Sequence, residues 1–266
     1  MTTTGPGALF RDGKLAEAVA AAEQRLRAAP TEAAARLLLA ELLLFAGQFE
    51  RADAVLVAAE AVDPSLAIVT AEYRQLLRAA AARLELFTHG RLPEFLGEPT
   101  QAQTCLLRAL VALRASDAQA ASAAAEEAER YRPDCPGRAN GAVFADFRDA
   151  DDLFGGTLEV LTTTGKYYWI PIERVTSMVF HAPRRVRDLF WRRCTMSVRD
   201  GPDGEVYIPA IYATGNGDET DEADSLRLGR RTDWSESAPV RGVGQRMFLV
   251  GEEGVPINRL ESVDFA

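Results

Sequence analysis

The chain has 266 residues, of which 47% are hydrophobic and 26% are charged, a composition typical of a globular protein. It carries 30 Lys and Arg against 39 Asp and Glu, and both halves are net acidic, so nucleic acids and anionic membranes are poor candidates as partners. The strongest apolar run, residues 37–46, contains Glu41 and is too short to span a bilayer, and the N-terminus lacks a signal-peptide pattern. We therefore expect a cytoplasmic protein without a membrane segment.

Composition divides the chain near residue 137. Before it Ala, Leu, Glu and Arg dominate, which favours helices, whereas clusters of Val, Ile, Thr and aromatic residues separated by Gly, Pro and Asp follow it. The sequence predicts an α+β protein with a helical domain at 1–137 and a small antiparallel, β-rich or barrel-like domain at 138–266. The segment 132–141, with two prolines and two glycines, is the expected joint.

The helical half contains a repeat. Four pairs of residues are each 34 positions apart: Gly13 and Gly47, Leu15 and Phe49, Ala18 and Ala52, and Pro30 and Pro64. A weaker copy places Ser116 at the glycine position, and a degenerate unit lies between the copies at 77–99. This spacing predicts tetratricopeptide-like helical hairpins with Gly13 and Gly47 in equivalent turns, stacked to leave a concave surface. A generic Ala-rich bundle is the alternative.

The second half reads as strands joined by turns. Runs rich in β-branched and aromatic residues predict five strands, at 157–163, 166–172, 175–180, 205–212 and 246–251. The segment 184–192 predicts a short helix or turn. The acidic stretch 217–224 is expected to be a mobile loop.

Motifs for catalysis are missing from the sequence. It has no GxSxG nucleophile motif and no phosphate-binding P-loop, and its two histidines, His89 and His181, lack cysteine neighbours that could complete a zinc site. The three cysteines are widely spaced without a CxxC pair, which fits buried thiols. We expect no cofactor and no metal.

Three carboxylates gather in the sequence RDADD, where Asp149, Asp151 and Asp152 could together present oxygen ligands to a divalent cation. Such a set would suit a metal-dependent hydrolase. Asp-rich turns more often bind backbone N–H groups, or here arginines of 184–193, so a structural turn is the favoured interpretation.

Aromatic residues and arginines supply the candidate interaction surface. Tyr, Trp and Arg are enriched where proteins bind partners, whereas the Ala-rich helices offer little contact area. The predicted protein-binding residues are Tyr167, Tyr168, Trp169, Arg187 and Trp191. Alternation along the strand at 166–172 puts Tyr167 and Trp169 on one face and Tyr168 on the other, so one set should be core and the other accessible.

Five blocks of the second half are similar to a known family. They are FRDADDLFGGTLEVLTTTGKYYWIPIERV (147–175), APRRVRDLFWR (182–192), EVYIPAIY (205–212), LRLGRRTDW (226–234) and GVGQRMFLVG (242–251). In this order they resemble the signature blocks of the ImpE/TagJ (SciE-type) family of bacterial type VI secretion accessory proteins, and the N-terminal repeat resembles that family's opening. Residues 152–156 and the acidic stretch 217–224 depart from the family pattern.

The resemblance implies a cytosolic adaptor without catalytic activity. Members of the family are understood to bind a helix near the N-terminus of the small sheath subunit, TssB, and so to connect the contractile sheath with the AAA+ disassembly ATPase, ClpV. The residues by themselves leave two further interpretations open, a metal-dependent hydrolase and a tetratricopeptide scaffold of another cytosolic complex.

Overall fold

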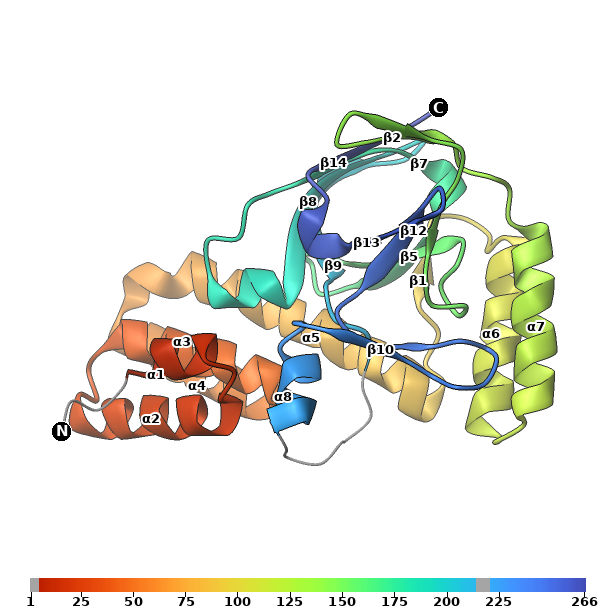
Figure 1. Ribbon diagram of the computed structural model, residues 1–266. Coiled ribbons are helices and arrows are strands. Elements are labelled where there is room, and N and C mark those ends of the chain that lie inside the picture. The colour runs from red at the N-terminus through yellow and green to blue at the C-terminus, as the bar shows by residue number, and fades with distance from the viewer. Residues whose placement is uncertain (1–4, 214–220) are drawn as a thin grey trace.

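The computed structural model describes residues 5–213 and 221–266, and its main helices lie below and beside a curved sheet (Figure 1). The α-helices are α1 (Pro6–Arg11), α2 (Leu15–Ala28), α3 (Ala33–Phe45), α4 (Phe49–Val62), α5 (Ala67–His89), α6 (Gln101–Arg114), α7 (Ala118–Tyr131) and α8 (Asp221–Arg227). The first seven fall in the half predicted to be helical. The predicted order of tetratricopeptide-like helices and then a β-rich part is confirmed.

A residue in the left-handed conformation closes each of three helical hairpins. Its φ angle is 86° at Gly13, 70° at Gly47 and 60° at Ser116. At all three turns this residue and the next donate their N–H groups to carbonyls of the preceding helix. Glycine adopts this conformation without steric cost, which explains its presence at two of the turns. The predicted equivalence of Gly13 and Gly47 is confirmed, and Ser116 takes the same place in the weaker copy.

One long helix replaces the hairpin expected between these copies. Helix α5 continues past Ala81, which lies 34 residues after Gly47. Arg74 lies 34 residues after Ala40, a fully buried residue of α3, and its Nε is 2.7 Å from Oδ1 of Asp53 on α4. A long charged side chain thus stands where the repeat has a small buried alanine, and α5 runs on through the position at which the repeat would turn.

Within residues 5–213 and 221–266 the strands form one large sheet and two small ones. They are β1 (Glu94–Phe95), β2 (Gly137–Ala139), β3 (Ala142–Phe144), β4 (Phe147–Asp149), β5 (Thr157–Leu161), β6 (Tyr167–Pro171), β7 (Val175–Phe180), β8 (Trp191–Val198), β9 (Asp203–Pro209), β10 (Thr232–Trp234), β11 (Gly242–Gly244), β12 (Met247–Val250), β13 (Glu253–Pro256) and β14 (Ser262–Phe265). The nine-stranded sheet has the order β1-β6-β5-β9-β8-β7-β14-β2-β3. Only its β1–β6 pair is parallel. The smaller sheets are β13-β12-β4 and β10-β11.

Each of the five predicted strand regions contains a strand, and 184–192 contains a short 3-10 helix at Val186–Leu189. The same segment departs from prediction at Trp191, which begins strand β8 rather than belonging to the helix. Of the acidic stretch 217–224, residues 217–220 lie outside the described residues. Residues 221–224 begin helix α8.

Three apolar clusters hold these elements together. One fills the space between the nine-stranded sheet and the sheet β13-β12-β4, with Phe147 and Phe248 stacked 4.9 Å apart at its centre, so the β-rich part is barrel-like. The other two join helices to the sheet: α1 to α5 pack against residues that include Trp191, and α5 to α7 pack against Phe154 and Trp169. Because both halves share these clusters, the division at residue 137 stays a prediction.

Two further features of the described residues bear on the expectations. The three cysteines are buried and form no disulfide, as their spacing indicated. No described helix combines the length and the apolar character needed to cross a membrane.

Candidate functional site

Strand β6 carries three of the predicted binding residues, and two of them are buried. Tyr167 is 2% exposed and Trp169 is fully buried. Both pack in the cluster formed with α5, α6 and α7. The predicted alternation is confirmed, but the prediction of these two side chains as accessible contacts is wrong, because the helices cover that face of the strand. Tyr168, on the opposite face, is partly exposed.

Arg187 and Trp191 are also buried, where the sheet meets α3 and α5. The Trp191 ring lies edge-on to Tyr73 with centroids 5.9 Å apart. Arg187 donates from Nη2 to Oε1 of Glu72 at 2.8 Å, and its guanidinium lies 5.0 Å from the centroid of the Tyr73 ring. The two residues join the helices to the sheet, so their prediction as exposed contacts is corrected.

A buried ion network centres on Glu159 of β5. Arg83 of α5 donates two hydrogen bonds to its carboxylate, at 2.7 and 2.8 Å, and Arg246 donates a third. The Tyr167 hydroxyl donates to Oε1 at 2.5 Å and in turn accepts from the Trp169 indole N–H at 2.7 Å. Burial by itself raises the pKa of Glu159, but the charges of Arg83 and Arg246 outweigh it and lower the pKa to about 2.

Arg246 extends this network to the carboxylate of Asp149. Its Nη1 lies 3.3 Å from Oδ2 of Asp149, and the Tyr212 hydroxyl donates to the Oδ1 of the same carboxylate at 2.7 Å. Arg246, Asp149 and Glu159 are all fully buried. Removing charges from water is costly unless each is paired and hydrogen-bonded. Every charge of this network is paired, although Oδ2 of Asp149 and Nε and Nη1 of Arg246 form no hydrogen bond. The group therefore fixes α5, β4 and β5 relative to one another.

The aspartates of RDADD form a structural turn. Asp149 accepts the N–H of Asp151 at 2.9 Å, and Asp151 accepts those of Leu153 at 2.8 Å and Gly242 at 2.9 Å. Burial and the nearby charge of Asp149 raise the pKa of Asp151 to about 7. Backbone N–H groups bind these carboxylates, as the favoured interpretation predicted.

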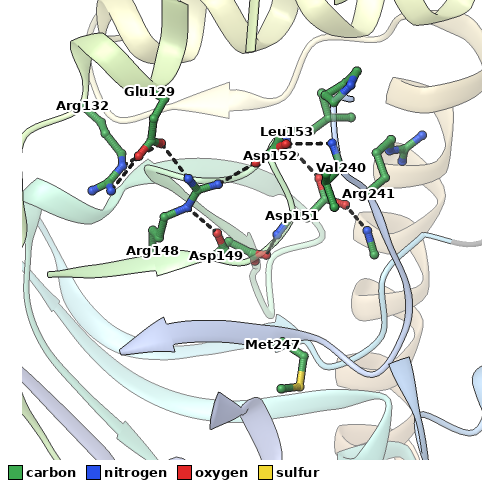
Figure 2. Close-up of polar contacts among 12 residues, drawn as sticks. Glu129, Arg132, Arg148, Asp149, Asp151, Asp152, Leu153, Val240, Arg241 and Met247 are labelled. Carbon is green, nitrogen blue, oxygen red and sulfur yellow. Dashed lines mark hydrogen bonds and ion pairs between the residues drawn. The ribbon is translucent and has the colours of Figure 1, made fainter. Parts of the chain in front are cut away.

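The arginine partners of the turn differ from those predicted. Figure 2 shows Asp152 between Arg148 and the backbone of Val240: it accepts from Arg148 Nη2 at 2.9 Å and from the Val240 N–H at 2.7 Å. Arg148 also pairs with Glu129 of α7 at 3.0 Å. Arg148 and Arg246, rather than arginines of 184–193, neutralise the turn. No described residues form a group of three or more His, Cys, Asp or Glu placed to hold a metal ion.

An open cleft of about 480 Å³ lies where the helices meet the sheet. The turns at Gly13 and Gly47 end at one edge of the repeat, whereas α5 continues past that edge. The cleft lies between the two turns and this extension of α5, with the sheet and α8 completing its walls. Its lining residues with apolar side chains are Leu15, Ala16, Val19, Leu44, Phe45, Ala46, Phe49, Ala80, Leu84, Phe190, Trp191, Ile211 and Ala213.

Polar groups line the rest of the cleft. Lys14 and Glu17 of α2 form an exposed pair at 3.2 Å, and Asp224 and Arg227 of α8 lie 3.7 Å apart. Sequence reasoning missed this site, except for Trp191, because its walls come from six separate stretches of chain. The sequence offered one signal, since Leu84 belongs to the degenerate unit 77–99 that departs from the repeat. The structure leaves its side chain 45% exposed.

Comparisons with known proteins match both parts of the chain. The tetratricopeptide repeat family matches residues 9–84, and the ImpE protein family matches residues 141–264. A protein of Pseudomonas aeruginosa named type VI secretion system accessory component TagJ is 34% identical over 259 residues, covering 97% of this chain and 89% of its own. The chain belongs to the ImpE/TagJ family.

The ImpE/TagJ resemblance noted in the sequence is thereby confirmed. A crystal structure of a protein from Vibrio parahaemolyticus is similar in fold, with a TM-score of 0.90 at 27% identity, covering 98% of this chain and 97% of that one. The helical half of this ImpE/TagJ protein is therefore part of the shared architecture, although the ImpE match itself begins at residue 141.

Proposed function

We propose that this chain is a non-enzymatic accessory component of a type VI secretion system that binds the N-terminal helix of the small sheath subunit, TssB. Through this contact it connects the sheath with the disassembly ATPase, ClpV. The similarity over 97% of the chain to a protein named as a type VI accessory component supports the system. A helical repeat joined to a second folded part suits a binding protein.

The open cleft is the observation that carries the proposal. In other repeat proteins the concave surface binds partners, whereas here the repeat packs on the β-rich part: the ring centroid of Phe190, just before β8, lies 5.1 Å from that of Phe45 on α3. The cleft between the repeat turns and the sheet offers both apolar area and charged edges. An amphipathic helix has matching features, with apolar side chains on one face and charges beside them.

The metal-dependent hydrolase gains no support from the geometry. Asp149, Asp151 and Asp152 are bonded to backbone N–H groups and to arginines, so binding a cation would cost those contacts. Calorimetric titration with Mg²⁺ and Mn²⁺ tests this directly. We expect no specific binding, and binding that Asp151→Asn removes would favour the hydrolase.

A second titration tests the partner. We expect the full-length chain to bind a fluorescent peptide spanning the N-terminal helix of TssB, and ClpV to be retained on the chain only when TssB is present. A generic scaffold predicts no binding to TssB. Because sheath subunits assemble inside the cell, we expect the protein in the cytoplasm.

A further inference from the structure

Two helices begin side by side at the cleft, because the repeat brings equivalent positions to one edge. Helix α2 begins at Leu15 and α4 at Phe49, and both residues line the cleft. Neither is capped by the residue before it, since the side chains of Lys14 and Gln48 accept no hydrogen bond from the helix backbone. The first N–H groups of a helix carry partial positive charge and favour a carboxylate.

The two helix starts differ in what they bind. A carboxylate oxygen of Asp224, from α8, accepts the N–H of Leu15 at 2.9 Å, so the chain itself supplies the acid at α2. Within the described residues no side chain does the same at Phe49. Gln48 instead accepts a hydrogen bond from Arg51, and Glu50, the acidic residue in the first turn of α4, does not line the cleft. The start of α4 is therefore positive, and among the described residues no carboxylate is bonded to it.

Apolar side chains adjoin this helix start. Phe49 is partly buried against the cluster that includes Trp191, and Leu84 of α5 is 45% exposed in the cleft. Exposed leucine gains by burial in a complex, and removing its apolar area from water supplies affinity. An apolar surface beside a positive helix end is complementary to apolar residues beside an acid.

We propose that the cleft is the docking site for the TssB helix, which places apolar side chains against Phe49 and Leu84 and an acidic side chain at the start of α4. The inference rests on the proposed function for the identity of the partner. The acid would bind the start of α4 as Asp224 binds the start of α2, and the apolar contacts would fix the register of the helix.

One pair of variants tests the apolar contact. Leu84→Glu introduces a charge into the cleft, and Ile68→Glu introduces the same charge on the same helix at a site that is 83% exposed and outside the cleft. We expect Leu84→Glu to weaken binding of the TssB peptide about tenfold or more, and Ile68→Glu to change it by less than about twofold. If Leu84→Glu does not fold, Leu84→Ser provides the same test.

A third variant tests the acidic contact with effects of opposite sign. Gln48→Asp supplies a cap to α4 from its own chain, as Asp224 does for α2. We expect this variant to have a higher melting temperature and an affinity for the TssB peptide about fivefold lower, because the partner's acid loses its site. Replacing the acidic residues of the peptide by glutamine should weaken binding to the wild type but bring no further loss with Gln48→Asp.

The outcomes separate the two proposals. Binding by the wild type that Leu84→Glu and Gln48→Asp leave unchanged would overturn the cleft as the docking site and leave the proposed function standing. If Leu84→Glu weakens binding of the TssB peptide and Gln48→Asp leaves it unchanged, the apolar contact is supported and the acidic contact is overturned. No binding by the wild type would overturn both.

Discussion

The helices meet the sheet in two regions that use their side chains in opposite ways. Around Glu159 the contact is closed and charged, and Arg83 and Arg246 are bonded to the same carboxylate. At the cleft the contact is open, with apolar side chains beside charged ones, and Leu84 is exposed. Losing one member of a buried ion pair leaves the other charge uncompensated, so these groups serve the fold, whereas apolar surface left in solvent is available to a partner. Residue type alone does not distinguish these roles.

This difference explains why four of the five predicted binding residues are buried within the chain. Tyr, Trp and Arg are enriched in interfaces between proteins, and the contact between the two halves of this chain is an interface of the same kind. Trp169, Trp191 and Arg187 serve there. The sequence shows which residues suit an interface but does not show whether the other side of it is this chain or another.

The largest expected effect is at the closed region. Glu159→Gln should lower the free energy of unfolding by about 3–5 kcal/mol, because two arginines lose their shared buried carboxylate. Urea unfolding followed by circular dichroism measures it. The matched control is Glu205→Gln, whose carboxylate pairs with Arg193 at the surface and is 49% exposed. We expect a loss of no more than about 1 kcal/mol there, and equal losses in the two variants would contradict the structural role of Glu159.

Asp151 should give the next largest effect. Asp151→Ala leaves the buried N–H groups of Leu153 and Gly242 without an acceptor, at a cost of about 1–3 kcal/mol in unfolding free energy. Peptide binding measured on the folded variant should stay as in the wild type. A variant with unchanged melting and lost binding would make the turn part of the docking surface.

A smaller effect concerns pH at the contact between α3 and the segment 186–189. Burial raises the pKa of Glu41 to about 7, against the opposing charge of Arg187. The folded state therefore holds this proton more tightly than the unfolded state, so the stabilisation is complete below about pH 4.5 and is lost as pH rises through 7. Between pH 5 and pH 8 the free energy of unfolding of the wild type should fall by on the order of 1 kcal/mol more than that of Glu41→Gln. Urea unfolding at a series of pH values measures this difference. If the free energy of unfolding depends on pH in the same way for both proteins, Glu41 does not titrate in this range.

The smallest effect is expected at Tyr168, the one predicted aromatic contact on β6 that is partly exposed. It lies outside the lining of the cleft, so Tyr168→Ala should change affinity for the TssB peptide by less than about twofold. Fluorescence anisotropy on the folded variant gives this value. A loss of tenfold or more would move the docking site to the exposed part of Tyr168 and the residues around it.

Local signals in the sequence predicted most of the elements and missed their packing. The Gly13 and Gly47 turns and the strand at 175–180 follow from backbone preferences, which act over a few residues. Strand β8 was not predicted, because Arg192 and Arg193 near its start obscure the pattern. Further along, Cys194, Met196 and Val198 alternate as in a strand with one buried face. The partners in the ion network could not be predicted from the sequence, because Arg83 and Arg246 are 76 and 87 residues away from Glu159 along the chain.

The cleft depends on an even less local cause. It exists because α5 continues where the repeat would turn, and only the position of the sheet shows that this extension forms a wall. In the sequence, Arg74 at the place of the buried Ala40 marks a departure from the repeat before that extension.

Amide hydrogen exchange of the chain with and without TssB tests the central claim most directly. The cleft account predicts new protection at residues 14–19, 44–49 and 80–84, with unchanged exchange along β6 and around Glu159, which are already buried. Protection confined to the outer face of the sheet, with no change in those three segments, would contradict it.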